Sequence, residues 1–324
     1  MTHEPRRGLR YASAKCVRPG RRWTSLWAAA LLALVLLLQG GGALAQDMEP
    51  RAFSAFPVDT NFLIMSYART TGGVSLVPSL PISDVQATIN TGTIAYDRGF
   101  DLFGQTASAG IELPYVEGHL TGDVEQDSRA ITRRGLGDLR MRVTENLIGN
   151  PAQTPAEFAA REPTTTLGVS LVAVAPTGNY NPNHLINISA NRWSFKPEIG
   201  VSQPIDDWFV EGAAGVWFFT DNEDLFHGHI QSEDPLWVLQ GHVGYNFGVN
   251  FWLALDGTHY TGGQTYLNGE SGHDVQTITR YGVTLSVPID DGFSAKFAWS
   301  TWLTARNGGT FNTLTFSLQY RWFD

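Results

Sequence analysis

The chain has 324 residues, with 22 basic and 31 acidic side chains and one cysteine, Cys16. Seven of the basic residues and one of the acidic residues lie in the first 45 positions, which leaves a formal charge of −15 on the remainder. This acidic balance argues against nucleic acid as a partner. The lack of cysteine after residue 45 excludes disulfides and thiol chemistry from that part.

Residues 1–45 have the pattern of an export signal. The basic residues precede an unbroken apolar run of 12 residues at 27–38, and Ala43-Leu44-Ala45 follows as a cleavage site. The run is shorter than the roughly 20 apolar residues of a membrane-spanning helix, and no comparable run follows. We therefore expect the mature chain to begin near Gln46 and to be exported to the bacterial outer membrane.

Residues 46–59 are short and irregular, with Pro50 and Pro57. Such a segment can enter a barrel lumen as a small plug or stay a loose periplasmic tail, and we expect the tail. Residues 60–324 then form one domain with twelve segments of strand character. These are 60–69, 83–96, 104–117, 135–146, 164–175, 191–203, 208–220, 235–247, 250–261, 275–288, 292–304 and 309–322.

The segments alternate between an apolar and a polar face with period two. In 309–322, Leu314, Phe316 and Leu318 share one face, and aromatic residues end the segment, as in the closing strand of an outer-membrane barrel. A soluble β-sandwich shows the same alternation. The export signal, the aromatics at segment ends and the loop lengths favour an all-β, 12-stranded antiparallel transmembrane β-barrel.

Loop lengths alternate along the chain. Loops after odd-numbered segments are mostly long (70–82, 118–134, 176–190, 221–234, 262–274 and 305–308), whereas several of the others are tight turns (206–207, 248–249 and 289–291). This asymmetry predicts that the long loops lie outside the cell.

Two local features depart from this pattern. In 147–163, Thr154-Pro155-Ala156-Glu157 predicts one short capped helix on the periplasmic side. In 83–96 the polar face switches near Thr91-Gly92, which predicts a bulge.

The sequence contains no nucleophile elbow, phosphate loop, HExxH or calcium loop. Some barrels of this size are hydrolases, but the histidines after the leader have no obvious serine and carboxylate arrangement around them. The acidic stretch 221–234 could hold a divalent cation, although its spacing favours a solvated loop. We expect no catalytic residue, metal or cofactor.

Charged residues on the polar faces are the candidate functional residues. Because a charge that faces lipid costs about 2–4 kcal/mol, the alternation places them in the lumen. They are Glu112, Asp138, Arg140, Arg142, Arg192, Lys196, Glu198, Glu211, Asp256, Arg280, Lys296 and Arg321. Such a mixed interior either forms structural latches or takes part in permeation.

Ten of these residues, all except Glu112 and Arg321, are our candidates for the lumen or its constriction. We expect Arg192, Lys196 and Glu198 to form a charged constriction with Arg140 and Arg142. The loop 176–190 would lie above this constriction as a lid.

Two stretches, GLGDLRMR at 135–142 and PTGNYNPNHLINISANRWSFKPEIG at 176–200, resemble the outer-membrane barrel family called putative MetA pathway of phenol degradation. The turn Pro-Thr-Gly, the Tyr and Asn-Pro loop and the strand opening after it recur together in that family. FDLFG at 100–104 and DPLW at 234–237 extend the resemblance over most of the chain after the leader. It implies a transporter that passes aromatic or other small hydrophobic compounds, and it assigns no substrate-binding residue.

From the pattern and the resemblance together we expect a passive outer-membrane channel for such solutes. A structural or interaction barrel with a blocked lumen and a barrel-embedded hydrolase are the alternatives, since 12 strands lie between filled and water-holding barrels. The expected partners are outer-membrane lipid, lipopolysaccharide, the outer-membrane assembly machinery and the solutes themselves.

Overall fold

A computed structural model describes residues 48–75, 82–124, 127–184 and 186–324. The expected export signal and its cleavage site lie outside these residues. Within them the chain is almost entirely β-structure, with one short helix, α2 (Pro155–Ala159). No helix in the described ranges has the length and hydropathy needed to cross a membrane.

Thirteen strands form one sheet, and the pairing of β2, at one end of the strand order, with β3, next to the other end, closes the sheet on itself. A separate four-stranded sheet contains β9 (Asn222–Leu225), β10 (His229–Glu233), β13 (Thr265–Leu267) and β14 (Glu270–Ser271). The strands of the closed sheet are β1 (Thr60–Ser75), β2 (Ile82–Leu102), β3 (Gln105–Val124), β4 (Asp127–Leu136), β5 (Leu139–Ile148), β6 (Thr166–Ala175), β7 (Ser194–Ile205), β8 (Trp208–Phe219), β11 (Leu236–Gly248), β12 (Phe251–Gly262), β15 (Gln276–Asp290), β16 (Phe293–Arg306) and β17 (Gly308–Phe323).

β4 and β5 share one position in the wall. β3 pairs with β5 through residues 107–112 and with β4 through residues 115–124. Between the two strands, the Gly137 N–H donates to the Pro114 carbonyl at 2.8 Å. The wall therefore has twelve antiparallel positions, and the predicted 12-stranded barrel is confirmed.

The polar faces of the strands point into the lumen and the apolar faces point outward. In β15, Thr284 and Ser286 are 5% and 2% exposed, whereas Leu314 of β17 is 61% exposed. A soluble sandwich would bury the apolar face between its sheets. The inverted arrangement identifies the apolar surface as the one that faces lipid.

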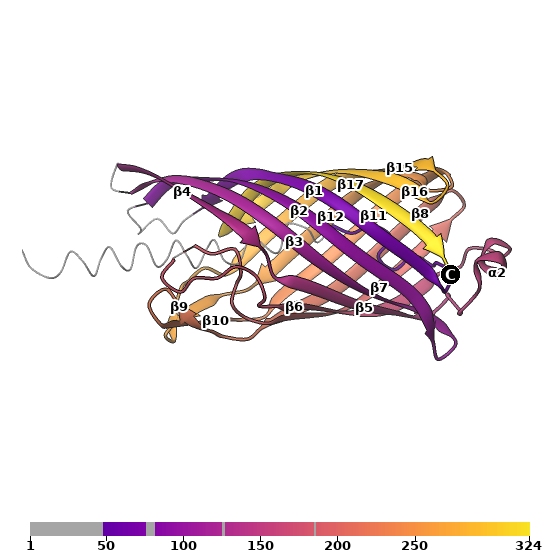
Figure 1. Cartoon of the computed structure of the whole chain (residues 1–324), viewed down its shortest axis with the longest axis horizontal. Coiled ribbons are helices and arrows are strands. Elements are labelled where there is room, and N and C mark those ends of the chain that lie inside the picture. Colours follow the sequence, from indigo (N-terminus) through magenta and orange to yellow (C-terminus); the bar gives the residue numbers. More distant parts are fainter. Residues whose placement is uncertain (1–47, 76–81, 125–126, 185) are drawn as a thin grey trace, which may run out of the picture.

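The short turns and the chain terminus lie at one end of the barrel, here called the short-turn end. Figure 1 shows the C-terminus and α2 at this end and β9 and β10 at the opposite, long-loop end. Aromatic rings gather near the short turns: Trp208 packs edge-on against Tyr245 at 5.1 Å, and Phe293 lies 4.5 Å from Tyr320. Such a rim is the aromatic girdle of an outer-membrane barrel.

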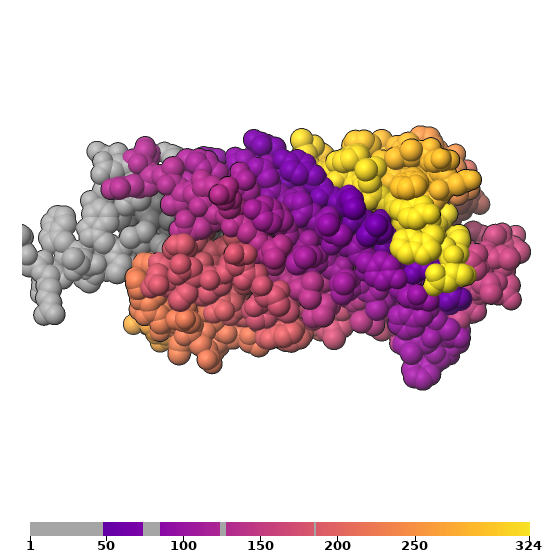
Figure 2. All heavy atoms as spheres, viewed as in Figure 1, coloured from indigo at the N-terminus to yellow at the C-terminus, as the bar shows by residue number. Residues whose placement is uncertain are grey.

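α2 has the predicted cap and projects beyond the rim (Figure 2). The Thr154 hydroxyl accepts from the Glu157 backbone N–H at 3.4 Å, and the Glu157 carboxylate accepts from the Thr154 N–H at 2.9 Å. The hydrogen bonds from the Thr154 backbone and side chain lower the pKa of Glu157. A four-residue motif was therefore enough to locate this helix.

At the long-loop end, the predicted loops 221–234 and 262–274 fold into the small sheet. The neighbouring wall carries an apolar cluster that points inward. Its buried members are Val172, Trp217, Leu236, Val238, Tyr260 and Ile278. This side of the lumen is therefore closed by packed side chains.

Two predictions about the first strands are wrong. Within the expected loops 70–82 and 118–134, the described residues 70–75, 118–124 and 127–134 are strand, because the hairpins keep pairing beyond the lipid-facing zone. β2 pairs in continuous register through Thr91 and Gly92, and its register shift lies between Ser83 and Gln86. The polar face switches at Thr91-Gly92 because the outward side of β2 becomes polar beyond the lipid, without any bulge.

Candidate functional site in the barrel lumen

Residues 48–59 lie inside the lumen and are called the plug below. Phe53 is 4% exposed and packs on Gly168 of β6 and Gly200 of β7, which pair across the strands. A Cβ atom would lie 2.9 Å from the Phe53 ring at Gly168 and 2.2 Å from it at Gly200. Only glycine at these two positions leaves space for the Phe53 ring. The expectation of a loose tail is therefore wrong, and the structure has the alternative, a plug in the lumen.

Glu211 of β8 holds the plug. Its carboxylate accepts the Arg51 backbone N–H at 2.5 Å and the hydroxyls of Ser54 and Ser202 at 2.7 Å each. The Arg51 guanidinium lies 4.3 Å from the Phe209 ring centroid, a cation–π contact. Hydrogen bonds to a carboxylate are roughly twice as strong as neutral ones, so this predicted lumen residue positions the plug.

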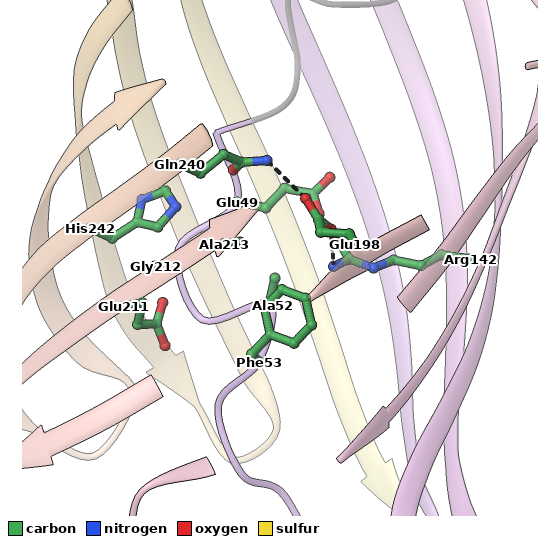
Figure 3. Close-up of a pocket in the computed structure, with 10 residues that line it drawn as sticks. All are labelled: Glu49, Ala52, Phe53, Arg142, Glu198, Glu211, Gly212, Ala213, Gln240 and His242. Atoms are coloured by element: carbon green, nitrogen blue, oxygen red, sulfur yellow. Dashed lines mark hydrogen bonds and ion pairs between the residues drawn. The ribbon is translucent and has the colours of Figure 1, made fainter. Parts of the chain in front are cut away.

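Glu198 of β7 is the hub of an ion network in the lumen. It lies 3.2 Å from the Lys196 Nζ and 3.3 Å from the Arg142 Nη2, and it accepts hydrogen bonds from Gln240 at 3.3 Å and Ser170 at 3.1 Å. Figure 3 shows Gln240 and Arg142 converging on this carboxylate. The adjoining space is a cavity of about 10 Å³, room for about one water molecule.

The plug joins this network through Glu49. Its carboxylate pairs with Arg142 and lies 3.6 Å from Arg140, which in turn lies 3.9 Å from Glu112. The structure thus brings together four of the five residues of the expected constriction, with a plug residue among them. Their part in permeation stays a prediction.

Arg192, the fifth residue of the expected constriction, lies elsewhere. It precedes β7 at the long-loop end, where it pairs with the buried Glu233 of β10 and stands 4.4 Å from the Phe219 ring centroid. Burial raises the pKa of Glu233, and the Arg192 charge opposes this rise. Arg192 therefore fastens the small sheet to the barrel, and its predicted place in the constriction is wrong.

Asp138 fastens the loop 176–190. Its two carboxylate oxygens accept the backbone N–H groups of Gly178 and Ala190, each at 2.9 Å. Because Asp138 lies in the break between β4 and β5, it can reach both ends of the loop. The loop also meets β4, where Arg133 donates to the Ile186 carbonyl at 2.9 Å.

Asp256 and Arg280 make local contacts in the lumen. Asp256 lies 2.7 Å from the His242 Nδ1 and accepts from the Thr284 hydroxyl at 2.7 Å. Arg280 donates to the Ser300 hydroxyl at 2.8 Å. Among the described residues no serine hydroxyl contacts His242, and no three His, Cys, Asp or Glu side chains gather closely enough to hold a metal ion.

Lys296, Glu112 and Arg321 line a larger cavity of about 500 Å³. It lies between the plug and the wall made by β15, β16, β17, β1, β2 and β3. Small side chains such as Ser66, Ala68 and Ala298 leave this space unfilled. The lumen is therefore partly packed and partly open.

The sequence did not reveal the plug contacts or the contact between His242 and Asp256. The second does not follow from the tight turn at 248–249, because a register shift between Asn246 and Gly248 lies between that turn and the paired positions 242 and 256. The packing of Phe53 on two glycines could not be predicted from a turn either. Gly168 and Gly200 are separated by the long loop 176–190, so their pairing does not follow from a turn.

A closed antiparallel barrel with a polar lumen, an apolar outer surface and an aromatic rim is an outer-membrane β-barrel. The family profile described as Putative MetA-pathway of phenol degradation matches residues 68–318. The chain belongs to this family, so the resemblance seen in the sequence is confirmed.

Several solved structures are similar to the chain. The COG4313 outer membrane channel from Pseudomonas putida F1 has a TM-score of 0.73 and 20% identity, over 85% of this chain and 100% of that one. The β domain of the Bordetella autotransporter BrkA has a TM-score of 0.49 and 14% identity, over 82% and 100%. At these identities the first likeness shows the fold alone. No curated protein matches the chain.

Proposed function

We propose that the protein is an outer-membrane channel that admits small aromatic or other hydrophobic molecules by passive diffusion. The observation that carries this proposal is the cavity of about 500 Å³ that the barrel leaves open beside the plug. Ligand sites have volumes of about 300–1,000 Å³, so the space suits a small molecule. The family description and the channel from Pseudomonas putida F1 support the same class of function.

The route into the cavity follows from what closes the lumen. Packed side chains close the long-loop end on one side. Among the described strands, in contrast, β4 pairs with β3 alone, and its other edge meets the loop 176–190. We infer that a hydrophobic molecule reaches the lumen at this edge, where a loop held by Asp138 replaces a strand.

A structural barrel with a blocked lumen is the second candidate. The observation that favours it is the ion network through Glu49 and Glu198, which joins the plug to the wall. The hydrolase alternative has less support, since the hydrogen bond of His242 runs to Asp256 and the described residues offer it no nucleophile.

The test compares solute uptake by vesicles whose outer leaflet is lipopolysaccharide, because that leaflet slows the unaided diffusion of hydrophobic molecules. We expect the full barrel to speed the uptake of benzyl alcohol more than that of a polar solute of similar size. Equal uptake with and without the barrel would support the blocked barrel. Heat-dependent gel migration reports on folding, and tags in 221–234 should be reachable on intact cells while a tag at Asp290 should not.

A further inference from the structure

The larger lumen cavity contains a row of polar side chains on five neighbouring strands. Consecutive strand pairings align Ser286 with Lys296, Lys296 with Ser317, Ser317 with Ser66, and Ser66 with Thr93. Directly paired residues have Cβ atoms about 5 Å apart. The Lys296 ammonium therefore stands among hydroxyl groups on a wall that faces open space.

Lys296 differs from Arg142 in its contacts. Arg142 lines the same cavity, but it pairs with Glu49 and Glu198. In the part of the chain that the structure describes, no carboxylate lies within ion-pair distance of Lys296; Glu49 and Asp97 act on its charge from farther away, and the Trp252 ring lies 5.9 Å from the Nζ. A charge inside a protein is costly unless it is paired, so this ammonium has an unfilled capacity for an anion.

The acids that line the cavity do not fill that capacity. Glu49 is held by Arg142, Glu112 lies 3.9 Å from Arg140, and Asp256 is held by His242 and Thr284. Asp97 also faces the cavity, and its carboxylate lies where a side chain at Gly110 would stand. An anionic ligand with a second negative group would be repelled by Asp97, so the arrangement favours a single carboxylate.

The hydroxyl next to Lys296 supplies a further donor. Ser286 already donates to the Asn250 carbonyl at 3.1 Å. Ser317 makes no such bond within the described residues, so its hydroxyl can donate to a ligand oxygen beside the ammonium. The body of the ligand would lie against Ala68 and Ala298, whose small side chains leave the space.

We propose that the cavity binds small organic monocarboxylates, with the carboxylate on the Lys296 ammonium and the Ser317 hydroxyl. The inference rests on the proposed function, because it names a class of solute for the same lumen. Aromatic acids of the size of benzoate fit both the volume and the single charge.

The test is calorimetric titration of benzoate and of benzyl alcohol into the full mature barrel in lipid nanodiscs, where no detergent can occupy the lumen. Benzyl alcohol is nearly the same size and lacks the charge. We expect saturable benzoate binding that Lys296→Met weakens at least tenfold and Lys296→Arg weakens less. Arg306→Met is the matched control, because it removes an exposed charge from the same strand and should leave binding unchanged.

Two outcomes would overturn the inference: no saturable binding of benzoate to the unaltered barrel, or equal binding by Lys296→Met. Heat-dependent gel migration checks that each variant is folded. Uptake of benzyl alcohol by the lipopolysaccharide vesicles separates this failure from failure of the proposed function. If uptake persists while benzoate binding is absent, the proposal of a channel is retained and the proposal of a carboxylate site is rejected.

Discussion

Replacement of Phe53 by alanine should release the plug from the wall. The ring is almost fully buried on Gly168 and Gly200, and the Arg142 guanidinium lies 5.6 Å from its centroid. Truncation of a buried phenylalanine to alanine costs about 3–5 kcal/mol. Since about 1.4 kcal/mol is a factor of ten, the undocked fraction of the plug should rise about a hundredfold to several thousandfold, while the barrel itself stays folded.

Trypsin cleavage after Arg51 measures this fraction, because a protease cannot reach a peptide bond that is docked inside the lumen. When docking is faster than cleavage, the cleavage rate follows the population of the open form. Mass spectrometry of the intact barrel would report the loss of the residues before Ala52. We expect cleavage of Phe53→Ala to be faster by about the same factor as the rise in the undocked fraction of the plug, with gel migration of the folded barrel unchanged.

A pair of glycine variants provides the control. Gly200→Ala would put a methyl group 2.2 Å from the Phe53 ring, whereas the nearest atom at Gly212 of the neighbouring strand is 3.9 Å away. Gly200→Ala should therefore expose the plug and Gly212→Ala should not. Wild-type cleavage rates in both Phe53→Ala and Gly200→Ala would refute the conclusion that Phe53 holds the plug by packing on Gly168 and Gly200.

Three further changes test other parts of the site. Asp138→Ala should leave two backbone donors of the loop 176–190 without their acceptor, at about 1–3 kcal/mol each, and limited proteolysis should cut the loop while the barrel persists; an uncut loop would contradict the anchor. Arg192→Ala combined with Lys196→Ala should raise or alter the passage of small solutes in reconstituted vesicles with folding intact, and unchanged flux of aromatic and polar solutes would make these charges structural latches. Because the capping hydrogen bonds lower the pKa of Glu157, the ionised carboxylate favours α2 above the ordinary glutamate range, and this contribution is lost as the pH falls through the lowered value. The protection of the α2 amides from exchange, corrected for the intrinsic pH dependence of exchange, should fall at acidic pH, and the same fall in Glu157→Gln would contradict this cause.

The wall of the barrel could be predicted because period-two alternation is a local signal. Each wall strand has an apolar side that faces lipid, so segments such as 275–288 and 309–322 could be predicted as strands without knowledge of the strands they pair with. Strand ends were predicted less well. β1 and β2 continue past the lipid, where backbone pairing no longer requires apolar side chains.

The contents of the lumen could not be predicted to the same degree, because they depend on register and depth. Lys196 and Glu198 are two residues apart on one strand, so their proximity followed from the alternation. Arg192 has the same place in the alternation as Lys196 and Glu198, but it lies before the start of β7 and pairs with Glu233 of the small sheet. The alternation shows which side of the wall a residue faces, and it does not show how far along the lumen the residue lies.

The charge of the wall explains where the plug docks. To the ion network, the wall contributes three bases, Arg140, Arg142 and Lys196, and two acids, Glu112 and Glu198. Among the ion pairs of the described residues, Glu49 adds the third acid, and its pairs with Arg140 and Arg142 join the plug to this side of the wall. Breaking a buried ion pair is strongly destabilising, so these pairs favour docking on this side. Lys296 lines the cavity beside the plug and makes no ion pair with Glu49 within the described residues, so the docked plug leaves this cavity open to a solute.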